Sequence, residues 1–131
     1  MDEGIELLAR LNDYYGSSYR PEGRLIFSKE KLFLYTGGET KLQHNWIGLH
    51  IANFDLSLTV EGAQKLGTTA AKNVITLTKE QARKYYRGED LAGFQGQGPA
   101  ILKTEDMIIG PGLLQEGKIK NILPESRKSK L

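Results

Sequence analysis

The sequence contains no cysteine, and only two histidines and one tryptophan among 131 residues. Without cysteine there are no disulfides, no thiolate nucleophiles and no zinc or iron–sulfur sites built on thiolates. Long apolar runs are also missing, because the longest, residues 32–35, is far shorter than the roughly 20 residues of a membrane-spanning helix. Residues 1–4 are acidic where a secretory signal would be basic. We therefore expect a cytoplasmic protein with no membrane partner.

Residues suited to catalysis or metal binding are scarce. His44 and His50 are six positions apart, which matches no common metal-binding spacing. No serine lies in a nucleophile-elbow context, and the adjacent carboxylates at 105–106 fall in an expected turn, where such groups are usually solvated. The sequence therefore predicts no catalytic residue, no metal site and no cofactor.

A glycine-rich stretch, Gly93, Gly96 and Gly98, invites comparison with loops that bind phosphate. That fingerprint requires a preceding strand and a helix that opens directly after the glycines. Residues 99–102 instead resemble a strand. We therefore expect these glycines to form a turn of a small barrel.

Overall composition is that of an ordinary globular protein, with 39% hydrophobic and 26% charged residues. The charge is uneven, because residues 1–76 contain 8 basic and 9 acidic side chains whereas residues 77–131 contain 10 and 7. From residue 118 onward a single acid, Glu125, accompanies five cations. This asymmetry favours a polyanion partner, although a solvated basic tail would give the same pattern.

The first half of the chain shows helical and strand patterns in turn. Apolar residues at 5, 8, 11 and 15 predict an amphipathic helix that ends near Gly16 and covers a sheet. Residues 25–27, 32–35 and 46–54 resemble strands. Thr59 is expected to cap a helix through residue 66, with Gly67 as a left-handed cap, a further helical turn at 70–72 and extended chain at 74–77.

The second half begins with the clearest local signal. Thr78 followed by Gln81 forms a capping-box pattern, which predicts a helix over 79–87 that stops at Gly88. Helical spacing places Ala82 with one or both of the tyrosines at 85 and 86 in the core. Short apolar runs at 100–102, 107–109 and 113–114 then indicate a small barrel. The expected fold is α+β, with a helix-and-sheet portion at 1–76 and a small β-barrel at 77–131.

Two groups of cations suggest contact with nucleic acid. The segment 83–88 combines three cations with two tyrosines at a helix end. Alternation in the segment 118–120 places Lys118 and Lys120 on one strand face and Ile119 on the other, and Arg127 adds a planar fork suited to phosphate. An edge strand protected from aggregation by lysine is the alternative explanation for the strand group.

These same stretches, 77–91, 109–110 and 120–127, resemble the PUA-like RNA-binding domain of Fmu/Sun-type RNA cytosine-5 methyltransferases. The resemblance implies a PUA-like barrel and an RNA-contacting surface. With the neighbouring cations, the candidate RNA-binding residues are Arg83, Arg87, Lys118, Lys120, Asn121, Arg127 and Lys128. Methyl transfer in that family needs a separate S-adenosylmethionine domain with cysteine nucleophiles, so methyltransferase activity does not carry over to this chain.

The expected function is binding of structured RNA, rRNA or tRNA, without catalysis, in RNA modification or ribosome biogenesis. A second hypothesis is an accessory subunit of a separate RNA-modifying enzyme, such as an RNA methyltransferase, or of an assembly factor, with an exposed apolar patch around Trp46 or Phe94. A third and weaker hypothesis is a small-molecule enzyme with a pocket between the two halves. Convergence of the two cation groups on one surface would favour RNA binding.

Overall fold

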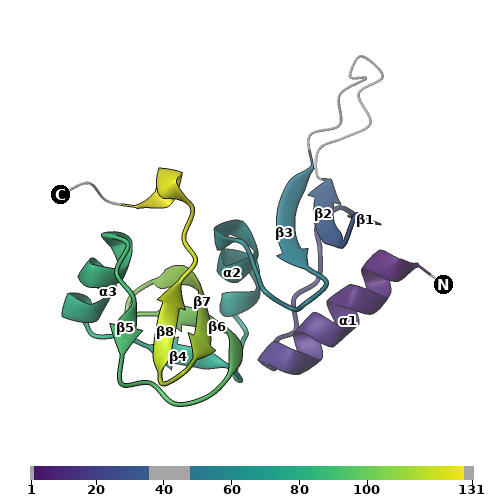
Figure 1. Ribbon diagram of the computed structural model, residues 1–131. Helices are drawn as coiled ribbons and strands as arrows, with labels where there is room; N and C mark the ends of the chain where they lie inside the picture. The colour runs from purple at the N-terminus through teal and green to yellow at the C-terminus, as the bar shows by residue number, and fades with distance from the viewer. Residues whose placement is uncertain (1, 36–47, 129–131) are drawn as a thin grey trace.

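The computed structural model describes residues 2–35 and 48–128. Its first part contains the helix α1 (Glu3–Tyr15) and the strands β1 (Arg24–Ser28), β2 (Lys31–Tyr35) and β3 (Leu49–Asn53). These strands form an antiparallel sheet in the order β1-β2-β3. Figure 1 shows α1 lying beside this sheet. The last turn of α1 reaches the second half of the molecule, where the Tyr14 hydroxyl donates to the Pro99 carbonyl at 2.7 Å.

The helix α1 is stabilised by a cap at each end and by one apolar stripe that packs on the sheet. The Asp2 carboxylate accepts hydrogen bonds from the first-turn N–H groups, and Gly16 ends the helix with left-handed backbone, φ 58°. Leu7, Leu8, Leu11 and Tyr15 are buried against the first sheet. The predicted helix over the sheet is confirmed.

Ile5 is an exception to the predicted stripe, because it is 59% exposed. The core-facing position in the first turn belongs to Gly4, where an added Cβ would lie 3.2 Å from Leu25. The buried stripe therefore includes Gly4 and Leu7 in place of Ile5. A hydrophobic pattern does not reveal a glycine that is required because only its lack of a side chain allows close packing.

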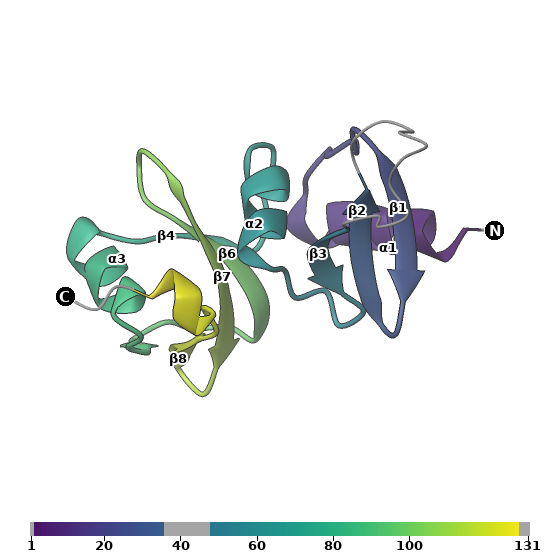
Figure 2. The same cartoon turned by 90° about the horizontal axis from the view of Figure 1, so that it is seen from above.

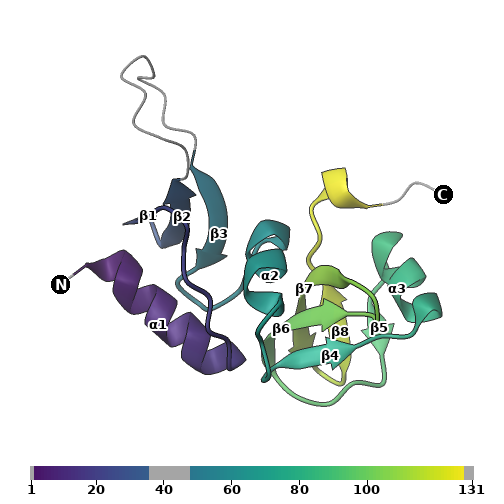
Figure 3. The ribbon, with the colours of Figure 1, turned by 180° about the vertical axis from the view of Figure 1, so that it is seen from behind.

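The second part begins with α2 (Val60–Gly67) and continues through β4 (Val74–Thr76), α3 (Lys79–Tyr86), β5 (Leu91–Ala92), β6 (Gly98–Lys103), β7 (Ile108–Gln115), β8 (Lys118–Asn121) and a 3-10 turn, η1 (Glu125–Arg127). The strands form a five-stranded sheet in the order β4-β6-β7-β8-β5, parallel only between β4 and β6. This sheet curls into a half-barrel with α3 at one end (Figure 3). The expected α+β class with a PUA-like barrel is confirmed.

The helix α2 lies between the two sheets and packs against both β3 and β7 (Figure 2). Thr59 caps it as predicted, accepting a hydrogen bond from the Gly62 N–H at 3.0 Å. Two details of the prediction are wrong. Gly67 is the last residue of α2 and not a left-handed cap, and its missing side chain makes room for Ile108 Cδ1. Residues 70–72 form no further helical turn.

The helix α3 has the capping box that the sequence predicts, with Thr78 and Gln81 each bonded to the other's backbone N–H. Its buried residues are Ala82 and Tyr85, so the prediction that a tyrosine enters the core is confirmed. The Tyr85 hydroxyl donates to the Pro111 carbonyl at 2.7 Å and accepts from the Ile122 N–H at 3.2 Å. Tyr85 thus joins α3 to β7 and to the chain beyond β8.

Tyr85→Phe is expected to reduce the free energy of unfolding by about 2 kcal/mol at neutral pH, because a buried carbonyl and a partly buried N–H lose their partner. Burial raises the pKa of Tyr85 to about 12. The unfolded state therefore loses this proton at a lower pH than the folded state, so the contribution is complete below about pH 10 and disappears as the pH rises through 12. Urea denaturation between pH 7 and 12 measures both effects. If the variant and the parent lose stability equally above pH 10, the role of Tyr85 is wrong.

Candidate nucleic-acid interface

The strand β8 presents its lysines as the sequence predicts. Ile119 is fully buried, Lys120 is exposed and Lys118 is partly exposed. Lys120 pairs in register with Leu113 of β7, and both lysines lie on the face of the sheet opposite Ile119. Lys118 also lies 3.5 Å from the Asp90 carboxylate, at the end of the turn that follows α3.

Asn121 joins the end of α3 to β8. Its side-chain amide donates to the carbonyls of Tyr85 at 2.7 Å and Glu89 at 3.0 Å. Its side-chain oxygen accepts from the Leu123 N–H at 3.1 Å, and its own N–H donates to Asp90 at 2.7 Å. The structure therefore shows this candidate RNA-binding residue as a brace between two backbone segments.

The two cation groups meet at the turn of residues 87–90. Arg87 pairs with Glu89 at 3.5 Å on one side of this turn. On the other side, the Lys128 side chain lies against Gly88, where an added Cβ would be 3.3 Å from its Cδ. Together with the Lys118–Asp90 pair, these contacts bring the helix end, β8 and the C-terminal turn next to one another. We call this assembly of Arg87, Lys118, Lys120 and Lys128 the basic junction.

Two further candidates are not part of the basic junction. Arg83 is exposed one helical turn before Arg87 and lies 3.8 Å from Glu80. Arg127 forms an ion pair with Glu61 near the start of α2. The C-terminal cations are thus divided, with Lys128 beside α3 and Arg127 beside α2.

Most of these cations already have an acidic neighbour. Arg83, Arg87, Lys118, Arg127 and Lys128 each form an ion pair with a nearby carboxylate. The pKa of Asp90 lies below its ordinary value, first because the Asn121 N–H donates to it and then because Lys118 is near. Exposed pairs of this kind contribute little, typically about 0–1 kcal/mol, so phosphate groups can replace the carboxylates. The surface is therefore a mixture of charges and not a uniformly basic patch.

A groove of about 640 Å³ lies between the two halves of the molecule. Its polar residues are hydrogen-bonded in series: His50 Nε2 lies 2.8 Å from Asn53 Oδ1, Asn53 donates to Ser57 Oγ at 2.9 Å, and Ser57 donates to Asp55 at 2.5 Å. Asn53 thus stands between the histidine and the serine, so the order needed for a serine nucleophile with a histidine base is not assembled. Among the described residues, no cluster of three or more histidine, aspartate or glutamate side chains suits a metal ion.

The sequence suggested a pocket between the two halves only within the enzyme hypothesis, and it did not predict the residues that line this groove. Asp55, Ser57 and Thr59 alternate with Leu56 and Leu58, a local signal for polar groups on one side of the chain. No local pattern predicts that these polar residues line one groove together with prolines that are distant in the sequence.

Of the two expected apolar centres, Phe94 is partly buried against the second core, and Trp46 lies outside the described residues. Across the described parts, 2–35 and 48–128, no helix is long and apolar enough to cross a bilayer.

The half-barrel, its flanking helix α3 and the braced strand β8 resemble a PUA-type domain. Residues 72–128 match the family model described as "Methyltransferase RsmF PUA domain". The resemblance stated from the sequence is therefore confirmed for this region. The match begins just before β4 and includes every candidate RNA-binding residue, while the expected boundary between residues 76 and 77 stays a prediction.

The curated relatives are much longer proteins. Ribosomal RNA small subunit methyltransferase F of Vibrio parahaemolyticus is 39% identical over 69 residues, which cover 47% of this chain and 14% of that protein. The protein of the same description from Vibrio campbellii gives the same identity and coverage. The chain thus spans about 14% of the length of the curated relatives it matches.

Proposed function

We propose that this protein binds RNA through its PUA domain, without catalysis of its own, and that it serves in rRNA modification. The observation that supports this most directly is the basic junction, where cations from three segments meet inside the matched region. Phosphates would contact Arg87, Lys118, Lys120 and Lys128, with Arg83 and Arg127 extending the surface. The relatives are named as ribosomal RNA methyltransferases, which makes rRNA the first RNA to test, with tRNA second.

A salt titration tests this proposal. Purified protein is titrated into rRNA fragments and total tRNA between 50 and 200 mM salt. Neutralisation of three to five phosphates predicts a slope of log affinity against log salt of roughly −2 to −4. The absence of measurable binding to either RNA at low salt would reject RNA binding and favour the accessory-subunit hypothesis.

The pair Lys118→Gln/Lys120→Gln is expected to make that slope less steep by about 1.4 and to weaken binding at low salt, because two phosphate contacts are lost. The pair Arg20→Gln/Arg24→Gln, at and just before the start of β1, removes the same charge from exposed positions outside both the basic junction and the groove, and should change little. Filter binding measures both. If both double variants lose the same RNA affinity, the β8 lysines act only through the overall charge of the protein and not through specific phosphate contacts.

Glu89→Gln is expected to strengthen RNA binding about two- to fivefold at low salt, because the carboxylate that competes for Arg87 is removed. Glu3→Gln in α1 makes the same charge change away from the basic junction and is the matched control. Unchanged affinity for Glu89→Gln would mean that Arg87 does not contact phosphate.

A further inference from the structure

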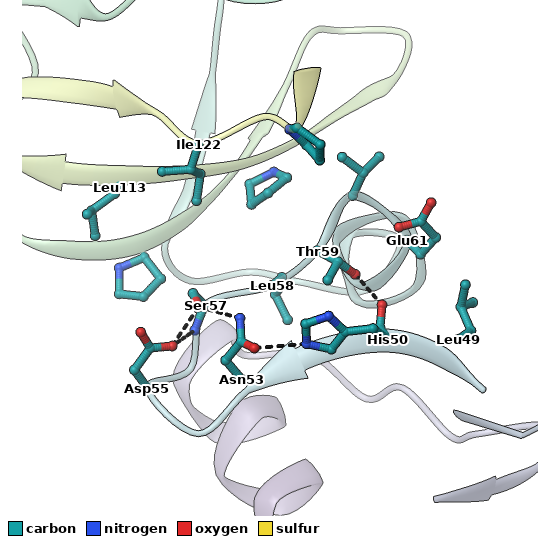
Figure 4. A pocket seen from close by; sticks show the side chains of 14 residues that line it. Leu49, His50, Asn53, Asp55, Ser57, Leu58, Thr59, Glu61, Leu113 and Ile122 are labelled. Atoms are coloured by element: carbon teal, nitrogen blue, oxygen red, sulfur yellow. Dashed lines mark hydrogen bonds between the residues drawn. The ribbon is translucent and has the colours of Figure 1, made fainter. Parts of the chain in front are cut away.

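The groove between the halves has two chemically different walls (Figure 4). Leu113, Ile122 and three prolines form an apolar wall on the outer face of the half-barrel. The opposite wall is polar and comes from β3 and the loop after it, with His50, Asn53 and Asp55. The groove volume, about 640 Å³, falls within the range of about 300–1,000 Å³ that is usual for ligand pockets.

The occupant must suit both walls. A nucleobase has two apolar faces and a polar edge, so it can pack flat on the proline and leucine wall while its edge meets the polar wall. Free phosphate does not suit the groove, because the carboxylates of Asp55 and Glu61 line it. Unpaired bases are also the part of RNA that proteins most often read by sequence.

Cations stand at both ends of this groove. Lys120 pairs in register with the groove residue Leu113 and precedes the groove residue Ile122 by two positions, which places it on the same sheet face. At the other end, Arg127 pairs with the groove residue Glu61. An RNA backbone held by Lys120 and Arg127 would therefore pass over the groove with a base directly between them.

The polar wall also favours one class of base. The Ser57 N–H and hydroxyl both donate to the same oxygen of Asp55, Oδ1, at 3.0 and 2.5 Å. These bonds hold the carboxylate in place and leave Oδ2 outside them. A fixed carboxylate oxygen accepts hydrogen bonds, so it suits a base with an exocyclic amino group, as in cytosine or adenine, better than the carbonyl of uracil.

We propose that this groove binds one unpaired, amino-bearing nucleobase of the RNA held at the basic junction. The proposal rests on the proposed RNA-binding function and adds to it a base-specific site at the joint of the two halves. The site needs both halves, because β3 and its following loop supply the polar wall and the PUA domain supplies the apolar one.

Binding of three fluorescent six-unit oligomers to the full chain tests the proposal: oligocytidine, oligouridine and an abasic ribose-phosphate chain. Stacking predicts that oligocytidine binds at least about fivefold more tightly than the abasic chain. The hydrogen bond to Asp55 predicts about a threefold preference for oligocytidine over oligouridine. Equal affinity for all three oligomers would overturn the groove proposal while leaving phosphate binding, and thus the proposed function, intact.

Two variants locate the effect. Leu113→Ala should reduce oligocytidine binding toward the abasic level, whereas Ile5→Ala, an exposed apolar truncation outside the groove, should not. Asp55→Asn can still accept from Ser57 through its side-chain oxygen and turns its amide toward the base, so the preference should move toward oligouridine.

Thermal melting of each variant confirms folding. A preference for oligocytidine that both groove variants retain would place the base elsewhere and reject the site. Failure of every RNA, rRNA fragments included, would instead reject the proposed function.

Discussion

Gly62→Ala is expected to lower the free energy of unfolding by more than about 4 kcal/mol, the largest effect of any substitution considered for this protein. A Cβ at this position would lie 1.8 Å from the Ile51 carbonyl oxygen and 2.8 Å from its carbon. Both are backbone atoms of β3, and the same oxygen accepts a hydrogen bond from the Thr59 N–H at 3.1 Å. The carbonyl therefore cannot move away without breaking the start of α2.

In an unconstrained helix the same substitution would be favourable by up to about 1 kcal/mol, because alanine has the higher helix propensity. Gly67→Ala, in the same helix, is the matched control. Its Cβ would meet the end of the Ile108 side chain at 2.7 Å, and a flexible side-chain end can turn aside. Urea denaturation of the two variants compares them directly. Similar stabilities would mean that α2 does not pack on the β3 backbone as closely as the structure shows.

The close packing of α2 on β3 at Gly62 also fixes the two walls of the groove relative to each other. The helix α2 packs against β3 on one side and β7 on the other, and its first residues, Val60 and Glu61, line the groove. A Gly62→Ala protein that remains folded should therefore show a displaced polar wall. Loss of base discrimination with retained phosphate binding is the expected consequence.

The parts of the fold that the sequence predicted have local causes. The N-caps of α2 and α3 depend on residues three positions apart, and the alternation of Lys118, Ile119 and Lys120 follows from strand geometry alone. Such signals need no knowledge of the rest of the chain. They were sufficient for the α+β class, for the barrel and for the buried tyrosine of α3.

The errors and omissions have long-range causes. Gly62 and Gly67 differ in neighbours that lie far along the chain, Ile51 and Ile108, so the sequence could not show that both are packing positions. The acidic partner of Arg127 is Glu61, 66 residues away, and no local pattern joins them. The groove likewise requires strands of both halves.

Asn121 shows how a family motif can mark a structural residue. Its side chain contacts the backbones of Tyr85, Glu89 and Leu123, and so fixes the end of α3 against β8. The brace stabilises the basic junction, because Arg87 and Lys118 come from the two elements that it joins. A residue of this kind can support RNA binding through the stability of the fold alone, without touching RNA.

Asn121→Asp is expected to lower the free energy of unfolding by about 3 kcal/mol at pH 7. The substitution keeps the shape but replaces the donating amide with a charged oxygen, opposite two carbonyl oxygens that the amide nitrogen contacts at 2.7 and 3.0 Å. Asp90 already accepts from the N–H of this residue, so a second carboxylate would lie nearby. These neighbours raise the pKa of the introduced carboxyl above its ordinary value. Part of the stability should therefore return below about pH 5, as that group gains a proton and can donate again.

The variant Asn121→Ala distinguishes a structural role of Asn121 from a direct contact between Asn121 and RNA. It removes the two donated hydrogen bonds, and also the one accepted from the Leu123 N–H, without adding charge. Its expected cost is smaller, about 1–2 kcal/mol, with no recovery in acid. At a temperature where this variant is fully folded, the brace role predicts RNA affinity within about twofold of the parent, since a single neutral hydrogen bond to RNA would contribute more than that. A drop of tenfold or more in the folded variant would instead make Asn121 a contact residue. Equal cost and equal pH dependence for the two variants would show that the side chain does not face the carbonyls of α3.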